Sequence, residues 1–413
     1  MLTALYADKN GKIYDAPGYQ AVGRSGDAVA LLSESDMIPL PPSAELMFLP
    51  GRSAVAGQKG AIEPIARELF AVAAILPAGY TRTVLPAFAK LPDAPHLPLF
   101  GYTAVAFKNG KLLVAAVKSD DNAKWDPRRY NGSDLAHRVA EIKRDLPNNR
   151  IVDQLANCSQ TWHCLTAQNL FYRRWEAGIP ASPVCNANCY GCISLQPAEC
   201  CPSPQSRIEF APTAAEIAAV GVYHLSTAPE GIISFGQGCE GEPSLAFENI
   251  SQAIRTIRSQ TDRGLININT NAGFSVGIRS IADAGLDTMR VSMISAIPEV
   301  YQAYYRANYQ LDAVAASIDY AKSRGIYVSI NLLLFPGLND TPDEIRAWQQ
   351  FIVDHQIDMI QLRNLNVDPD DFWQFMDRPA ATAVGVKTFI EALRQASPKL
   401  VVGSFSRYVR CVE

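Results

Sequence analysis

The second half of the chain alternates short apolar runs with longer amphipathic segments. The apolar runs are rich in β-branched residues and have the length of strands buried on both faces. They predict strands at residues 231–235, 265–269, 288–293, 327–334, 359–362 and 400–402. Between them, helical spacing of apolar positions predicts helices at 246–260, 277–284, 311–324, 342–355 and 384–396. This alternation implies parallel strands joined by right-handed crossovers, either as a barrel or as an open doubly wound sheet.

The first 150 residues follow another pattern. Short β-type runs at 28–32, 102–107 and 111–117 are interrupted by segments rich in proline and glycine, and Asn109-Gly110 predicts a hairpin turn. We therefore expect a strand-rich accessory domain over 1–150. Helical patterns at 134–145 and 153–175 lead into a helical bridge over 151–178. The main α/β domain would then span 179–370, and 371–413 would add a last helix and strand.

Composition excludes several classes of protein. The 413 residues are 48% hydrophobic and 19% charged, which is ordinary for a globular protein. A net charge of -4 makes a nucleic-acid partner unlikely. Neither a signal peptide nor an apolar run long enough for a membrane span is present, so we expect a cytoplasmic protein. Nine cysteines, most of them between 158 and 239, favour metal binding over disulfides in that compartment.

Three of these cysteines form a close group. Cys185, Cys189 and Cys192 have the spacing C-x3-C-x2-C, and Gly191 with the neighbouring asparagines permits the tight turns needed to wrap a cluster. Three thiolates leave one iron of a [4Fe–4S] cube without a protein ligand, as a substrate-binding cluster requires. Zinc bound with help from Cys200 and Cys201, or three unrelated core cysteines, are the alternatives.

The triplet, with aromatic Tyr190 before Gly191-Cys192, resembles the signature of the radical S-adenosylmethionine (SAM) superfamily. The resemblance implies a partial (β/α)6 TIM-like barrel whose oxygen-sensitive [4Fe–4S] cluster binds SAM. An electron from a donor such as flavodoxin or ferredoxin would cleave SAM to a 5′-deoxyadenosyl radical. That radical would abstract hydrogen from a peptide, a protein or a small metabolite.

Further matches follow the triplet at successive strand ends. Gly241-Glu242-Pro243 resembles the end of the family's GGEP motif, Asn271 its T-N-G strand end, and 289–293 its R-V-S-L strand. The resemblance therefore implies that SAM is bound by Tyr190, Gly241, Glu242, Pro243, Asn271, Arg290, Ser292, Arg306 and Asn331. Gln361, Arg363 and Asn364, near the end of a late strand, are the predicted substrate contacts.

Three other interpretations remain to be weighed. Gly236-x-Gly238-x-x-Gly241 also fits a dinucleotide-binding turn, but no carboxylate ends the next strand to hold a ribose. A second metal centre is an open alternative, with Cys158, Cys164, Cys200 and Cys201 as its candidate ligands. A non-catalytic iron–sulfur or zinc protein acting in redox sensing or scaffolding is the alternative function. It would leave the strand-end motifs without a purpose.

Overall fold

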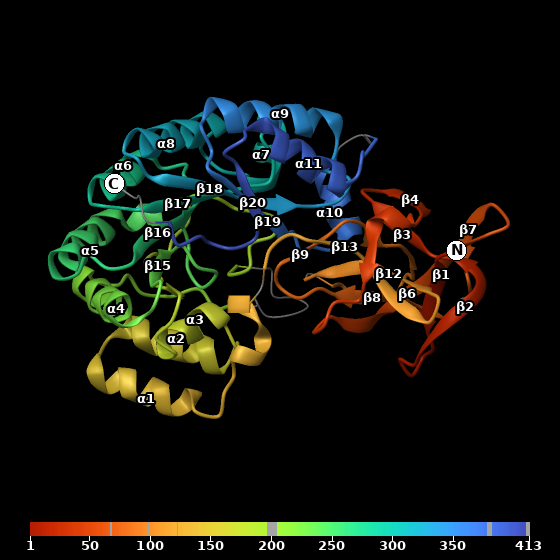
Figure 1. Ribbon diagram of the computed structural model, residues 1–413, viewed down its shortest axis with the longest axis horizontal. Coiled ribbons are helices and arrows are strands. Elements are labelled where there is room, and N and C mark those ends of the chain that lie inside the picture. The colour runs from red at the N-terminus through yellow and green to blue at the C-terminus, as the bar shows by residue number, and fades with distance from the viewer. Residues whose placement is uncertain (67, 98, 122, 196–204, 378–381, 410–413) are drawn as a thin grey trace.

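The computed structural model describes residues 1–66, 68–97, 99–121, 123–195, 205–377 and 382–409 (Figure 1). The strands are β1 Thr3–Ala7, β2 Ile13–Gln20, β3 Val22–Ser25, β4 Ala28–Leu31, β5 Met37–Pro39, β6 Glu45–Gln58, β7 Ala61–Pro64, β8 Phe70–Ile75, β9 Tyr80–Arg82, β10 Leu85–Pro86, β11 Phe88–Lys90, β12 Tyr102–Lys108, β13 Lys111–Lys118, β14 Glu176–Gly178, β15 Ile232–Phe235, β16 Leu265–Thr270, β17 Thr288–Met293, β18 Tyr327–Leu334, β19 Met359–Asn364 and β20 Val401–Gly403. The α-helices are α1 Leu135–Asp145, α2 Arg150–Gln160, α3 Leu165–Phe171, α4 Ala214–Thr227, α5 Phe247–Gln260, α6 Ser275–Asp283, α7 Pro298–Tyr305, α8 Leu311–Ser323, α9 Pro342–Asp354, α10 Pro369–Met376 and α11 Val386–Ala396.

The N-terminal strands form an antiparallel sheet. Strand β6 pairs with both β2 and β8, so the path β6-β2-β1-β8 returns on itself around a small apolar core. The predicted hairpin is present: β12 and β13 are joined by Asn109 and Gly110, whose φ angles are 50° and 74°. Positive φ at both positions is the backbone of the two-residue turn that an Asn-Gly pair favours.

A helical segment connects this sheet to the second half of the chain. The helix predicted at 153–175 is wrong as one continuous element, because α2 ends at Gln160 and α3 begins at Leu165. The break is local: His163 takes the left-handed conformation with φ 51°, and Cys164 has extended backbone where α3 starts. A left-handed residue cannot continue a right-handed helix, so the chain turns here.

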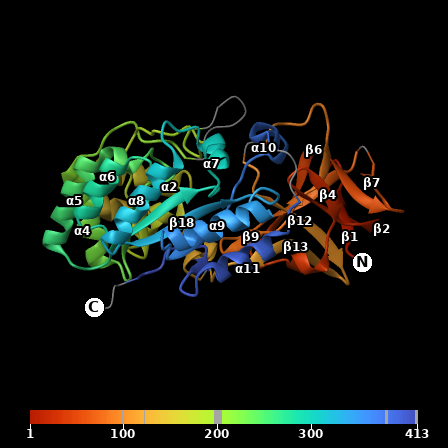
Figure 2. The same ribbon diagram turned by 90° about the horizontal axis from the view of Figure 1, so that it is seen from above.

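The second half confirms the α/β prediction. Strands β14 to β20 pair in chain order, all parallel, and helices α4, α5, α6, α8, α9 and α11 cover one side of the sheet (Figures 1 and 2). Among the described residues the edge strands β14 and β20 do not pair, so the barrel is partial. Its first strand is β14, which ends before the proline-rich segment 180–183. No helix in the described ranges combines the length and apolarity needed to cross a membrane.

The antiparallel sheet packs against one end of the parallel sheet, around β19 and α10 (Figure 1). We call this the inter-sheet contact and define it by Arg52, Arg82, Asn364 and Asp368. Arg52 is fully buried and forms an ion pair of 2.8 Å with Asp368. Asn364 accepts a hydrogen bond of 3.0 Å from the backbone of Arg82, whose guanidinium donates to backbone carbonyl groups on both sides of the contact.

Candidate cofactor site

The three cysteines of the triplet lie in the segment 179–195, which we call the cysteine loop. It follows β14 and lies at the carboxyl ends of the parallel strands. One side of the loop is tied to helix α7: the backbone N–H of Asn188 donates to Tyr305 and that of Tyr190 to Tyr304, at 3.0 and 3.2 Å. The side chain of Arg306 donates to the carbonyl of Asn188 at 2.7 Å. These bonds hold the backbone of the triplet from outside the barrel.

The turn after β15 holds the other side of the loop. The N–H groups of Gly241 and Glu242 donate to the carbonyls of Ser182 and Val184 at 2.7 and 2.8 Å. A Cβ atom at Gly241 would lie 2.0 Å from the carbonyl oxygen of Val184, so no larger residue fits without moving the backbone. The glycine of the predicted motif therefore brings the turn against the cysteine loop.

Glu240 was not among the predicted site residues, yet it joins the two loops. Its buried carboxylate accepts backbone N–H bonds from Ala181, Ser182, Gly236 and Gln237, at 2.6–3.0 Å. Burial raises the pKa of Glu240 to about 7, against the four N–H bonds, which lower it. In the sequence, Glu240 directly precedes the Gly-Glu-Pro pattern and belongs to no motif of its own, so nothing local identified it as a site residue.

A pocket of about 410 Å³ opens between the cysteine loop and the strand ends. Seven of the predicted residues line it, and they are Cys185, Cys192, Gly241, Arg290, Ser292, Asn331 and Arg363. They come from the loop, from the turn after β15 and from strands β17, β18 and β19. Residues far apart in sequence thus meet at the strand ends, where barrel enzymes place their active sites.

The thiols fit a cluster better than a single zinc ion. Burial raises the pKa of Cys185 and of Cys189, so a bound cation is needed to hold both as thiolates at neutral pH. Their sulfurs and that of Cys192 are not all within 4.8 Å of one another. Sulfur ligands of one tetrahedral zinc would lie about 3.8 Å apart. An iron–sulfur cube, whose corner irons are separate, accepts the wider spacing.

Arg207 is a second site residue that the sequence did not reveal. Its guanidinium lies 3.6 Å from the sulfur of Cys192 and donates to the hydroxyl of Ser194 at 3.0–3.1 Å. A cation beside a thiolate favours its charged form. Arg207 stands in an irregular segment 15 residues after Cys192, so neither periodicity nor motif spacing pointed to it.

The other predicted SAM contacts lie beside the pocket without lining it. Glu242 accepts hydrogen bonds from Thr270 and from the backbone of Asn271 and Ser244, so its carboxylate is already satisfied at the end of β16. Asn271 donates to Asn186 of the cysteine loop at 2.7 Å. The remaining three, Tyr190, Pro243 and Arg306, pack around the loop. Their roles toward SAM stay predictions.

The predicted substrate residues separate into two groups. Arg363 lines the pocket and donates to Asn331 at 3.0 Å and to Gln361 at 3.2 Å. Asn364, the next residue, points elsewhere: its amide bonds to the backbone of Arg82 and Tyr80 in the inter-sheet contact. Successive residues of a strand face opposite sides. The structure therefore places Asn364 in the inter-sheet contact and away from the pocket.

The candidate second metal site is only partly described. Cys200 and Cys201 lie outside the described residues. Cys158 and Cys164 are neighbours, with the backbone N–H of Cys164 donating to the carbonyl of Cys158 at 3.0 Å. Cys239 is buried beside Cys158, and the contact lowers the pKa of Cys158 and raises that of Cys239. A second metal centre stays a prediction.

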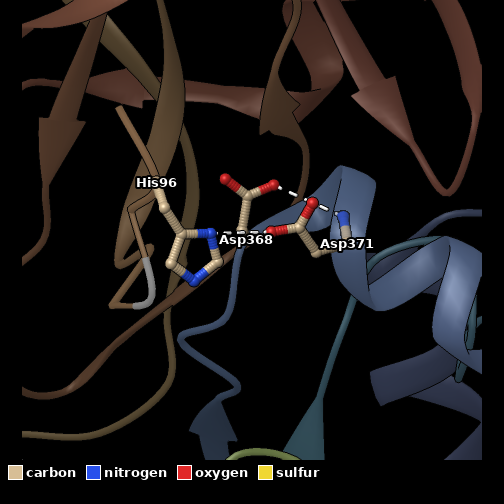
Figure 3. A group of neighbouring side chains, drawn as sticks. All are labelled: His96, Asp368 and Asp371. Atoms are coloured by element: carbon tan, nitrogen blue, oxygen red, sulfur yellow. Dashed lines mark hydrogen bonds and ion pairs between the residues drawn. The ribbon is translucent and has the colours of Figure 1, made fainter. Parts of the chain in front are cut away.

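One group within the described ranges has the spacing of metal ligands, and it lies at the inter-sheet contact. Figure 3 shows His96, Asp368 and Asp371 with their side chains together. Both carboxylates already have basic side chains as partners: Asp368 pairs with Arg52 at 2.8 Å, and Asp371 lies 2.8 Å from His96 and 3.4 Å from Lys90. These contacts account for the group as part of the packing between the sheets.

The chain resembles known proteins over this region. Residues 179–348 match the profile of the radical SAM superfamily. GTP 3′,8-cyclases of Staphylococcus carnosus and Staphylococcus haemolyticus are 32% and 31% identical over 97 residues, or 24% of this chain and 28% of each relative. The chain thus matches less than a third of the length of these relatives.

Two solved structures are similar in fold. A radical SAM methyltransferase from Sphaerobacter thermophilus has a TM-score of 0.38 at 16% identity, covering 55% of this chain and 64% of that one. Streptococcus suis SuiB bound to its precursor peptide SuiA has a TM-score of 0.39 at 15% identity, covering 61% and 52%. The matched region contains the cysteine loop, the turn after β15 and the strands β15 to β18. By the profile match, residues 179–348 form a radical SAM region, and the cofactors of that superfamily are a [4Fe–4S] cluster and SAM.

Proposed function

We propose that this protein reductively cleaves SAM and uses the resulting radical to abstract hydrogen from a peptide, a protein or a small metabolite. The observation that carries the proposal is the pocket itself, which two cysteines of the triplet share with Arg290 and Ser292 of β17 and Asn331 of β18. A purely structural or redox-sensing cluster would not need a pocket of about 410 Å³ beside it.

Different residues of the chain would bind the cluster and position the loops around it. Cys185, Cys189 and Cys192 would hold the [4Fe–4S] cluster, which supplies one electron to the sulfonium of SAM. Arg207 would hold the sulfur of Cys192 in place by a hydrogen bond of 3.6 Å. Glu240 would fix the cysteine loop against the turn after β15 through its four backbone bonds. A donor such as flavodoxin or ferredoxin stays the predicted source of the electron.

Arg290 would help to shape the floor of the pocket. Its guanidinium forms an ion pair of 3.0 Å with Glu176 of β14, and Glu176 also accepts from Ser234 at 2.7 Å and Ser406 at 2.6 Å. This network links the first strand to β15, to β17 and to the segment after β20. It would keep the strand ends at a fixed separation under SAM, which is the kind of positioning on which radical transfer depends.

The test is formation of 5′-deoxyadenosine. Anaerobically reconstituted protein is given dithionite and SAM, and the product is measured by mass spectrometry together with iron and sulfide per chain. Cys185→Ala, Cys189→Ala and Cys192→Ala should each abolish the product and the brown absorbance of the cluster. Cys411→Ala, outside the triplet, is the matched control. An iron-loaded wild-type protein that forms no 5′-deoxyadenosine would refute the proposed function.

A further inference from the structure

The pocket is lined by several charged side chains, of which one, Glu240, is a carboxylate. Three arginines line it, namely Arg207, Arg290 and Arg363, and they differ in what surrounds them. Arg290 has a carboxylate partner in Glu176, and Arg207 lies against the sulfur of Cys192. The third, Arg363, has no carboxylate within ion-pair distance among the described residues. Its hydrogen-bond acceptors are the neutral amide oxygens of Asn331 and Gln361.

Arg363 has one guanidinium nitrogen that is not used in a hydrogen bond within the described part of the chain. Its Nε and Nη2 atoms are bonded to the two amides, and Nη1 has no partner in the described part of the chain. Arg363 is half-buried and lines the pocket, and Nη1 is not among the buried polar atoms that lack a partner. Burial, and then the charge of Arg290, lower the pKa of Arg363 to about 10, so it still carries its charge at neutral pH.

Arg363 lies across the pocket from the cofactor side. The cysteine loop follows β14 and the Gly241 turn follows β15, whereas Arg363 is the second-last residue of β19, and β16, β17 and β18 lie between β15 and β19 in the sheet. A ligand held by the cysteine loop and by Gly241 would therefore meet Arg363 only at its far end, or through a second molecule bound between them.

We propose that Arg363 binds an anionic group of the substrate, a carboxylate or a phosphate, and that the substrate of this enzyme is accordingly an anion. A guanidinium presents two parallel N–H groups that match the two oxygens of either group. Glu176 and Asp120 act on the charge of Arg363 from beyond ion-pair distance, so an anionic ligand would supply the direct pair that this partly desolvated cation lacks among the described residues. The inference adds a substrate class to the proposed function, and it rests on that function because only an enzyme has a substrate.

Binding of simple anions to cluster-loaded protein tests the inference without any turnover. Inorganic phosphate and succinate are titrated separately by calorimetry into wild-type protein and into Arg363→Gln, and the stronger of the two probes assigns phosphate or carboxylate. We expect the substitution to weaken binding of that probe by about tenfold or more, because a charge-assisted hydrogen bond is lost. Arg363→Lys keeps the positive charge but loses the two parallel N–H groups of the guanidinium, so its affinity for the anion should lie between those of the wild type and Arg363→Gln.

The matched control is Arg346→Gln. Arg346 is exposed on α9 and pairs only with Asp343 among the described residues, so the same change of residue type there should leave anion affinity unaltered. Circular dichroism and iron content show whether each variant is folded and loaded. Equal affinity of wild-type protein and folded Arg363→Gln for both anions, or no binding of either anion to the wild type, would overturn the inference.

SAM also carries a carboxylate, and its affinity is measured in the same variants by equilibrium dialysis. A loss of SAM affinity as large as the loss of anion affinity would assign Arg363 to SAM and overturn the inference. Failure of the proposed function gives a different result: anion binding would depend on Arg363, while wild-type protein would form no 5′-deoxyadenosine. The two proposals can therefore fail separately.

Discussion

Two neighbouring parts of the molecule each contain a desolvated arginine, but the two arginines differ in whether a carboxylate pairs with them. In the inter-sheet contact, Arg52 is enclosed completely and its charge is matched by Asp368. In the other part, Arg363 lines the pocket and has only amide oxygens as hydrogen-bond partners among the described residues. An enclosed cation with a carboxylate is part of the packing, whereas a cation without one, beside a cavity, is available to a ligand.

Removal of Arg52 should have the largest effect on stability. Arg52→Met leaves the buried carboxylate of Asp368 without its cation, and breaking a buried pair in this way costs about 3–5 kcal/mol. Urea denaturation measures the change in the free energy of unfolding. The control is Arg24→Met, since Arg24 pairs with a more exposed carboxylate, Asp370, and such pairs contribute about 0–1 kcal/mol. Equal losses of unfolding free energy in the two variants would show that the Arg52–Asp368 pair stabilises the fold no more than a partly exposed pair does.

Glu176 is an intermediate case, because it pairs with an arginine inside the pocket. Burial alone would raise the pKa of Glu176, but Arg290 and the hydroxyls of Ser406 and Ser234 lower it below its ordinary value of 4.5. Its stabilising contribution is therefore present above pH 4.5 and is lost as the pH falls through the lower, folded-state pKa. Glu176→Gln should cost about 2 kcal/mol at pH 7 and flatten this acid-side slope.

Denaturation curves collected from neutral pH down to the acid limit of the native state measure this slope. Glu209→Gln, at an exposed carboxylate, serves as the control and should keep the wild-type slope. A slope in Glu176→Gln as steep as that of the wild type would mean that other carboxylates dominate acid unfolding.

Of these residues, Arg363 should contribute least to the free energy of unfolding. This expectation separates it most clearly from Arg52. Arg363→Gln leaves no carboxylate unpaired and relieves a desolvated charge, so we expect a change within about 1 kcal/mol of the wild type. The measurement is again urea denaturation of the cluster-loaded protein. A loss as large as that of Arg52→Met would show that Arg363 is a structural residue, in contrast to a ligand-binding one.

The sequence predicted the parallel sheet well because its strands are buried on both faces and therefore read as continuous apolar runs. The predicted strands at 288–293 and 327–334 coincide with β17 and β18. Strand β14 was missed because three residues, Glu176-Ala177-Gly178, carry no periodicity. Its glutamate lies inside the fold because Arg290 and two hydroxyls satisfy it, and these partners are 58 to 230 residues away in the chain.

The candidate site was predictable where local motifs describe it. The cysteine spacing and the Gly241 turn are short-range features, and the structure brings both to one pocket. Asn364 could not be separated from Arg363 by sequence, because the difference depends on which side of β19 meets the antiparallel sheet. Arg207 and Glu240 act through contacts with loops that only the tertiary structure assembles.

The inter-sheet contact has a consequence for how the chain is made. Arg52 and Arg82 leave the ribosome far ahead of the residues they bind, with 316 residues between Arg52 and Asp368 and 282 between Arg82 and Asn364. At roughly 5–20 residues per second, that interval lasts about 15–60 s. During that interval the antiparallel sheet has, among its described residues, only its own carbonyl groups, those of Pro50, Pro95 and Phe100, as partners for these guanidinium groups, and its final neighbour is added only once β19 and α10 have been made.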